Sequence, residues 1–157
     1  MRRQKGFSLI ELLVVVAIIL IIAALAIPSY LRGRMAANES SAVASLRTLN
    51  TAQVSYFTTY PSVGFAASLT ALTGTNCSPP TSASACLIDT GLATGLKNGY
   101  TFSLTNASGT PSNSYTAKAS PVLANYSGVR YYCSYEDAVV RAATSAISTC
   151  DGTVAPQ

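Results

Sequence analysis

The chain lacks histidine altogether, and only 10% of its 157 residues are charged. Without histidine, a Ser–His catalytic pair is excluded, and the set of ligands that commonly holds zinc is incomplete. The chain also has no glycine-rich phosphate-binding loop, and its few carboxylates form no pattern that suggests catalysis. We therefore expect a protein that is not an enzyme and that uses neither a metal nor any other cofactor.

The formal charge of +4 is weak evidence for any partner. Arg2, Arg3 and Lys5 supply three of the ten basic side chains, and they stand together at the start of the chain. If processing removed them, the seven that remain (ten minus three) would face six acidic side chains. We therefore expect no direct nucleic-acid site.

Cysteine is sparse, with four residues and no C-x-x-C pair. In an exported protein, an even number of cysteines is typical of disulfides formed in an oxidising compartment. Four cysteines allow three pairings, and four buried free thiols remain the alternative. The simplest pairing joins Cys77 to Cys86 and Cys133 to Cys150, so that each bond closes a short loop.

A long apolar run from Phe7 to Ile27 follows the basic residues and contains a single charge, Glu11. These 21 residues would span roughly 31 Å as a helix, enough to cross a hydrocarbon core of about 30 Å. Basic residues ahead of such a segment stay on the cytoplasmic side. The remainder of the chain is therefore expected outside the cytoplasm, in agreement with the cysteines.

Three interpretations of this run compete. The first is an ordinary membrane anchor, and the second is a secretory signal cut after Ala26, since Ala24-Leu25-Ala26 fits the small-residue pattern of such sites. The third starts from Glu11, because an ionisable group in a membrane segment is costly and usually has a partner. Neither an anchor nor a signal peptide needs that acid.

The stretch from Lys5 to Glu11 (KGFSLIE), with the apolar run that continues to Pro28, resembles the class III signal of type IV pilins and related pseudopilins. The resemblance covers about the first 30 residues. It implies that a prepilin peptidase cuts between Gly6 and Phe7 and methylates the new Phe7 amine. It also implies that Glu11 pairs with the Phe7 amine of a neighbouring subunit.

Such a pair is physically reasonable. Cleavage leaves a cation among apolar helices, and a carboxylate on the adjacent subunit can neutralise it. A subunit docked out of register would leave a buried charge unpaired, at a cost of several kcal/mol.

One departure from many relatives is Leu20, which stands where they have glycine.

The function implied by the resemblance is a structural one. The subunit would wait in the inner membrane, and the type IV pilus assembly machinery would then polymerise it into an extracellular helical filament. Such pili serve twitching motility, adhesion, biofilm formation or DNA uptake. A pseudopilin of a type II secretion system is one alternative, and an exported enzyme or binding protein cut after Ala26 is an alternative of another class.

Beyond Pro28 the apolar pattern is again helical, although proline costs about 3 kcal/mol inside a helix and bends it. We expect one bent helix over 8–58, kinked at Pro28 and ended by Tyr60-Pro61. Ser45 is expected to lie off its apolar stripe. The stripe itself is formed by Leu31, Met35, Ala42, Leu46, Leu49 and Tyr56.

The later residues predict an antiparallel meander. Strands are expected over 100–105, 115–119, 129–135 and 139–143, and a short helix over 66–72. The fold class is then α+β, the type IV pilin fold, with one long bent N-terminal helix packed on a small antiparallel sheet. The expected parts are a leader (1–6), a transmembrane and filament-core helix (7–28), an amphipathic helix half (29–58), a connecting αβ-loop (59–98), and a sheet with a disulfide-bounded C-terminal region (99–157).

Overall fold

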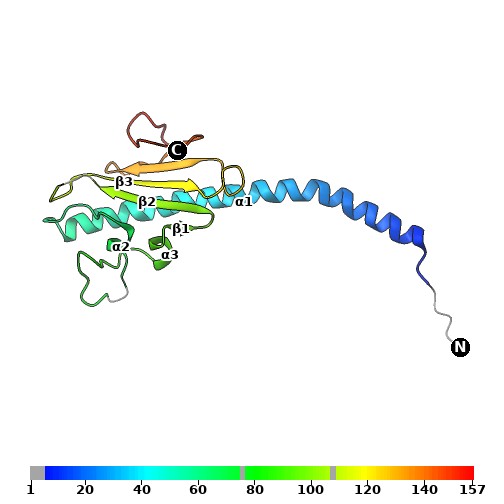
Figure 1. The fold of residues 1–157 in the computed structure, drawn as a ribbon, viewed down its shortest axis with the longest axis horizontal. Coiled ribbons are helices and arrows are strands. Elements are labelled where there is room, and N and C mark those ends of the chain that lie inside the picture. The colour runs from blue at the N-terminus through cyan, green and yellow to red at the C-terminus, as the bar shows by residue number, and fades with distance from the viewer. Residues whose placement is uncertain (1–5, 75–76, 107–108) are drawn as a thin grey trace. The chain divides into compact units, whose positions relative to one another are not determined.

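A computed structural model describes residues 6–74, 77–106 and 109–157 (Figure 1). The chain divides into two compact units, Met1–Arg34 and Met35–Gln157. We call the first the N-terminal unit and the second the head. Apart from Gly6, the expected leader lies outside the described residues.

Helix α1 is a single element of 51 residues, Leu9–Thr59. It begins and ends within one residue of the predicted limits, and it stops just before Tyr60-Pro61, where proline disfavours a helical preceding residue. The helix continues through Pro28, whose missing N–H leaves the carbonyl of Ala24 without its usual helical donor. The kink expected at Pro28 stays a prediction.

Within the head, α1 buries one face in the hydrophobic core. The predicted stripe is correct from Ala42 to Tyr56, whereas Met35 is only half-buried and Leu31 is exposed. Ser45 was expected off the stripe and is in fact buried, because the covered face is broader than a narrow apolar stripe. The buried residues of α1 are Ala42, Val43, Ser45, Leu46, Leu49, Asn50, Ala52, Gln53 and Tyr56.

Five antiparallel strands form one sheet in the order β1-β2-β3-β4-β5. The α+β class and the meander are thus confirmed. The strands are β1 (Leu96–Lys97), β2 (Tyr100–Asn106), β3 (Tyr115–Pro121), β4 (Tyr131–Tyr135) and β5 (Arg141–Ala143).

Three details of the sheet differ from the prediction. Strand β1 was not expected, since two residues give no readable alternation. Strand β4 begins at Tyr131 rather than at residue 129, because Glu39 accepts hydrogen bonds from the backbone N–H groups of Val129 and Arg130. Strand β5 begins at Arg141 rather than at residue 139.

One face of the sheet packs on α1, as the shared core cluster shows. Strand β2 has the predicted alternation, with every second residue buried. On β4 the core residue is Tyr132, while Cys133 faces the opposite side and is covered there by the C-terminal segment. The core side chains of the strands are Tyr100, Phe102, Leu104, Tyr115, Ala117, Ala119 and Tyr132.

Two one-turn helices, α2 (Leu69–Leu72) and α3 (Thr90–Ala93), lie in the connecting region. The first was expected from residue 66 and the second was not expected. Helix α2 begins late because the side chain of Gln53 bonds both backbone groups of Ala66, which fixes that residue before the helix starts.

Candidate assembly segment

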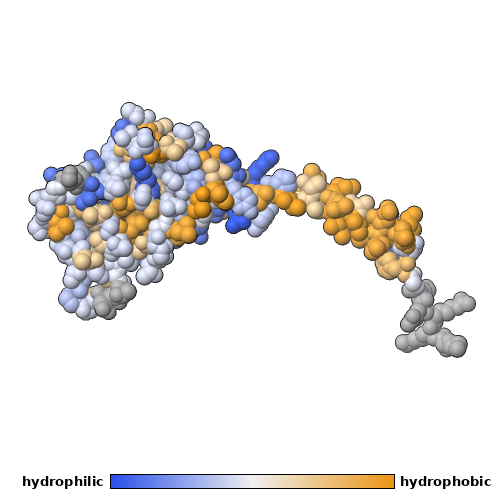
Figure 2. All heavy atoms as spheres, viewed as in Figure 1, coloured by the Kyte–Doolittle hydropathy of each residue, from blue (hydrophilic) through white to orange (hydrophobic). Residues whose placement is uncertain are grey.

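The N-terminal unit exposes an apolar surface on every side. Residues 6–22 are all exposed, and 79% of Phe7 is accessible. An 18-residue window of α1 has a mean hydropathy of 3.2, so by length and composition the helix is able to cross a membrane. Figure 2 shows these side chains as an almost unbroken run of orange atoms. A surface of this kind needs lipid or protein around it.

The bond between Gly6 and Phe7 precedes the helix, which starts at Leu9. Both residues are exposed, and neither is part of a helix or a strand. The expected cleavage site therefore lies in a chain terminus whose backbone is not protected by helical hydrogen bonds.

Glu11 lies in the first turn of α1, and its Oε2 accepts a hydrogen bond from the backbone N–H of Ser8 at 2.9 Å. This is one half of a capping box, in which a Ser at the N-cap precedes a Glu by three residues. A carboxylate there is also favoured by the helix dipole. The S-x-x-E signal stands in the sequence, and our sequence interpretation missed it.

The carboxylate of Glu11 borders an open apolar hollow on the helix surface. Phe7 lies on the same side of the helix start as Glu11, and both line this hollow with Ile10, Val14 and Val15. The structure thus brings together the two residues that were expected to act in assembly. An acid in this position stabilises its own helix start and is also accessible to a cation from outside the subunit.

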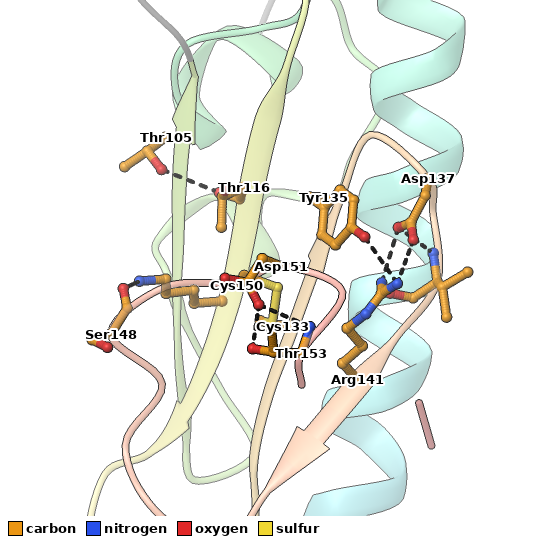
Figure 3. The surroundings of a disulfide bond; sticks show 12 residues. Thr105, Thr116, Cys133, Tyr135, Asp137, Arg141, Ser148, Cys150, Asp151 and Thr153 are labelled. Carbon is orange, nitrogen blue, oxygen red and sulfur yellow. Dashed lines mark hydrogen bonds and ion pairs between the residues drawn. A yellow bond between two sulfur atoms is a disulfide. The ribbon is translucent and has the colours of Figure 1, made fainter. Parts of the chain in front are cut away.

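The head contains two disulfides, Cys77–Cys86 and Cys133–Cys150, separated by 9 and 17 residues in sequence. No cysteine among the described residues is free. The second bond joins β4 to the segment that follows β5 (Figure 3). It therefore anchors the C-terminal segment on the face of the sheet that α1 does not cover.

An ion pair braces the turn between β4 and β5, next to this disulfide (Figure 3). Asp137 accepts hydrogen bonds from both terminal nitrogens of Arg141, at 2.6 and 3.1 Å. The guanidinium of Arg141 also lies over the ring of Tyr135. Burial alone would raise the pKa of Asp137, but hydrogen bonds from Arg141 and from the N–H of Val139 outweigh it and lower the pKa. The ionised pair therefore contributes to the stability of this turn.

Within the described part of the chain, no group of three or more His, Cys, Asp or Glu side chains is placed to hold a metal ion. The described residues thus provide structural cross-links and an exposed apolar helix.

Comparison with known proteins agrees with these features. The family described as a prokaryotic N-terminal methylation motif matches residues 1–27. The chain is 49% identical over 55 residues to the type IV major pilin protein PilA of Myxococcus xanthus, and 54% identical over 46 residues to the type IV wide pilus major component PilA4 of Thermus thermophilus. It is also 50% identical over 52 residues to a fimbrial protein of Pseudomonas aeruginosa.

These alignments cover 35%, 29% and 33% of this chain and 25%, 35% and 34% of the respective relatives. The chain thus spans about a quarter to a third of the length of the curated relatives that it matches. No solved structure matches the chain significantly. The methylation motif, the exposed apolar helix and the α+β head nevertheless agree with one another, and in its N-terminal third the chain is similar to type IV pilins.

Proposed function

We propose that this chain is the structural subunit of a type IV pilus and that it polymerises through the N-terminal part of α1. The observation that carries this proposal is the all-round exposure of the apolar segment in the single chain. Burying apolar surface contributes roughly 25 cal/mol per Å², so packing this helix against copies of itself is a large cohesive term. Contact with lipid serves the same helix before assembly.

Processing precedes assembly in this proposal. A prepilin peptidase cuts between Gly6 and Phe7 and methylates the amine of Phe7. The new cation then pairs with Glu11 of the neighbouring subunit. The accessible site of cleavage and the exposed carboxylate at the helix start support this sequence of events.

The proposed route begins in the inner membrane, where the segment spans the bilayer once, and ends on the cell surface. The type IV pilus assembly machinery extracts the subunit into the growing extracellular filament. The two disulfides of the head support an oxidising destination. The filament would then serve twitching motility, adhesion, biofilm formation or DNA uptake.

Mass analysis of the mature N-terminus tests the proposal most directly. A chain that starts at methylated Phe7, in filaments sheared from the cell surface, is the expected result. A chain that starts at Ile27 would instead indicate an ordinary exported protein. Deleting the gene should abolish surface pili, whereas loss of protein secretion with pili intact would assign the chain to a secretion pseudopilus.

A further inference from the structure

The loop between β3 and β4, residues 122–130, presents a cluster of apolar side chains to solvent. Val122, Leu123, Tyr126 and Val129 are 51%, 59%, 57% and 41% exposed. Single exposed apolar residues are ordinary, but four of them within eight residues form a patch of the kind that marks an interaction surface. Tyrosine is also among the residues that dominate binding energy in protein interfaces.

This loop is held firmly by α1. Asn38 donates from Nδ2 to the carbonyl of Ser127 at 2.8 Å, and Oε1 of Glu39 accepts the N–H groups of Val129 and Arg130 at 2.8 and 3.2 Å. In Figure 1 the end of β3, from which the loop departs, lies beside α1. A loop whose conformation is already fixed loses little entropy when it binds. The apolar side chains are therefore presented in a preorganised form.

The head also contains a groove between α1 and the turn that joins β4 to β5. Its floor is fixed by Asn50, which donates from Nδ2 to the carbonyl of Ala138 at 2.9 Å and accepts from the hydroxyl of Tyr115 at 3.0 Å. Val54 is 51% exposed on one wall. The groove has a volume of about 380 Å³ and is lined by Arg47, Asn50, Thr51, Val54, Ser55 and Ala138.

The loop and the groove lie far apart on the head. Along α1, the loop is bonded at Asn38 and the groove at Asn50, and these 12 residues of helix correspond to about 18 Å. Along the sheet, β4 separates Arg130 from Glu136, which corresponds to roughly 20 Å of strand. Two different surfaces at separate places allow a heterologous contact, which produces an open filament rather than a closed dimer.

The charges beside the two surfaces are complementary. Arg130 ends the loop, Glu136 precedes the groove residue Ala138 by two positions, and both side chains are exposed. Among the residues that the structure describes, neither forms an ion pair. Arg47 on the groove wall supplies a further cation that is suited to the face of an aromatic ring such as that of Tyr126.

We propose that the loop 122–130 of one subunit docks into the groove between α1 and the β4–β5 turn of the next subunit in the filament. The occupant of each surface is thus a second copy of this chain. Tyr126 enters the groove beside Arg47 and Val54, and Arg130 meets Glu136 at its edge. This proposal rests on the proposed function and adds a head-to-head contact to the packing of the helices.

Photo-crosslinking from Tyr126 tests the contact in assembled filaments. With p-benzoylphenylalanine in place of Tyr126, irradiated filaments should give covalent dimers on a reducing gel. Peptide mapping should join the probe to residues 47–55 or 136–139 of the second copy. A probe at Val54 should map back to 122–130, and subunits dispersed in detergent should give no dimer. Dimers joined elsewhere, or crosslinks only to lipid or to another protein, would overturn the proposal.

A charge exchange provides a second test that needs no probe. Arg130→Glu and Glu136→Arg should each reduce pilus yield several-fold, and the double variant should restore it, because the exchange re-forms the pair between copies. A double variant no better than either single variant contradicts the contact. If the unmodified chain forms no filaments at all, the proposed function itself fails, and that result is distinct from either crosslinking outcome.

Discussion

Oε1 of Glu39 accepts a hydrogen bond from the backbone N–H of Val129 at 2.8 Å, although 90 residues separate the two in sequence. The same oxygen accepts from Arg130, and Oε2 accepts from the hydroxyl of Tyr132 at 3.3 Å. One carboxylate on α1 thus holds the end of a loop and the start of β4. Burial, together with the charge of Glu39, raises the pKa of Tyr132 to about 12.

Removing this carboxylate should loosen the head. We expect Glu39→Ala to lower the free energy of unfolding by about 2 kcal/mol, because two backbone donors lose a charged acceptor. Chemical denaturation of the subunit in detergent, followed by near-ultraviolet circular dichroism, measures the change. Glu136→Ala is the matched control, since an exposed surface residue should change stability by less than about 0.5 kcal/mol. Equal midpoints for the two variants would refute the bracing role.

The sequence predicted the elements that depend on local pattern. The alternation of Tyr100, Phe102 and Leu104 is confirmed as the buried face of β2, and the helical period after Pro28 is confirmed as the second half of α1. Both signals arise from neighbouring residues, and neither requires knowledge of the tertiary contacts. The fold class followed from these signals and from the resemblance to pilins.

The sequence did not reveal contacts between polar side chains and distant backbone. Three polar side chains of α1 look ordinary in the sequence, yet each forms a hydrogen bond with the backbone of a segment outside α1. They belong to Asn38, Glu39 and Gln53. Such partners are set by the tertiary fold, so a periodic pattern cannot indicate them. These bonds shift the starts of α2 and β4 from their predicted positions. The cap formed by Glu11 is different, because its S-x-x-E pattern was readable and was overlooked.

The disulfide between Cys133 and Cys150 should make a large contribution to the stability of the head. Replacing both residues by alanine opens a loop with a sequence separation of 17, for which chain entropy gives about 3 kcal/mol. Thermal unfolding should therefore shift to lower temperature, and hydrogen exchange should increase in residues 144–150. The pair Cys77→Ala and Cys86→Ala is the control, since it should leave exchange in 144–150 unchanged. Unaltered exchange in both variants would argue against anchoring by the second bond.

Acid should weaken the turn between β4 and β5. The pKa of Asp137 is lower in the folded protein than its ordinary value of about 3.9. The ionised carboxylate therefore stabilises the fold at pH values above about 3.9. This contribution is lost as the pH falls through the folded pKa. We expect the free energy of unfolding to decline below about pH 4 and the decline to be shallower in Asp137→Asn.

A double-mutant cycle tests whether Arg141 is the cause of that shift. Arg141→Gln should flatten the same part of the pH profile, and adding Asp137→Asn to it should change little, since the partner is already absent. Unfolding in urea at a series of pH values supplies the measurement. Additive losses in the double variant would show that the two residues act independently.

Glu11 has two separable roles, and one substitution distinguishes them. Glutamine also serves in a capping box, so Glu11→Gln keeps the bond to the N–H of Ser8 and removes only the charge. If the charge pairs with a neighbour's Phe7 amine, this variant leaves a buried cation unpaired. An uncompensated buried charge costs about 3–5 kcal/mol, so pilus yield should fall by about a hundredfold or more while membrane insertion is unchanged. Cell fractionation and the yield of sheared pili measure the two quantities, with Glu11→Ala expected to match Glu11→Gln in both. Normal yield in Glu11→Gln together with loss in Glu11→Ala would mean that the residue acts through its own helix start, and the pairing between subunits would have to be abandoned.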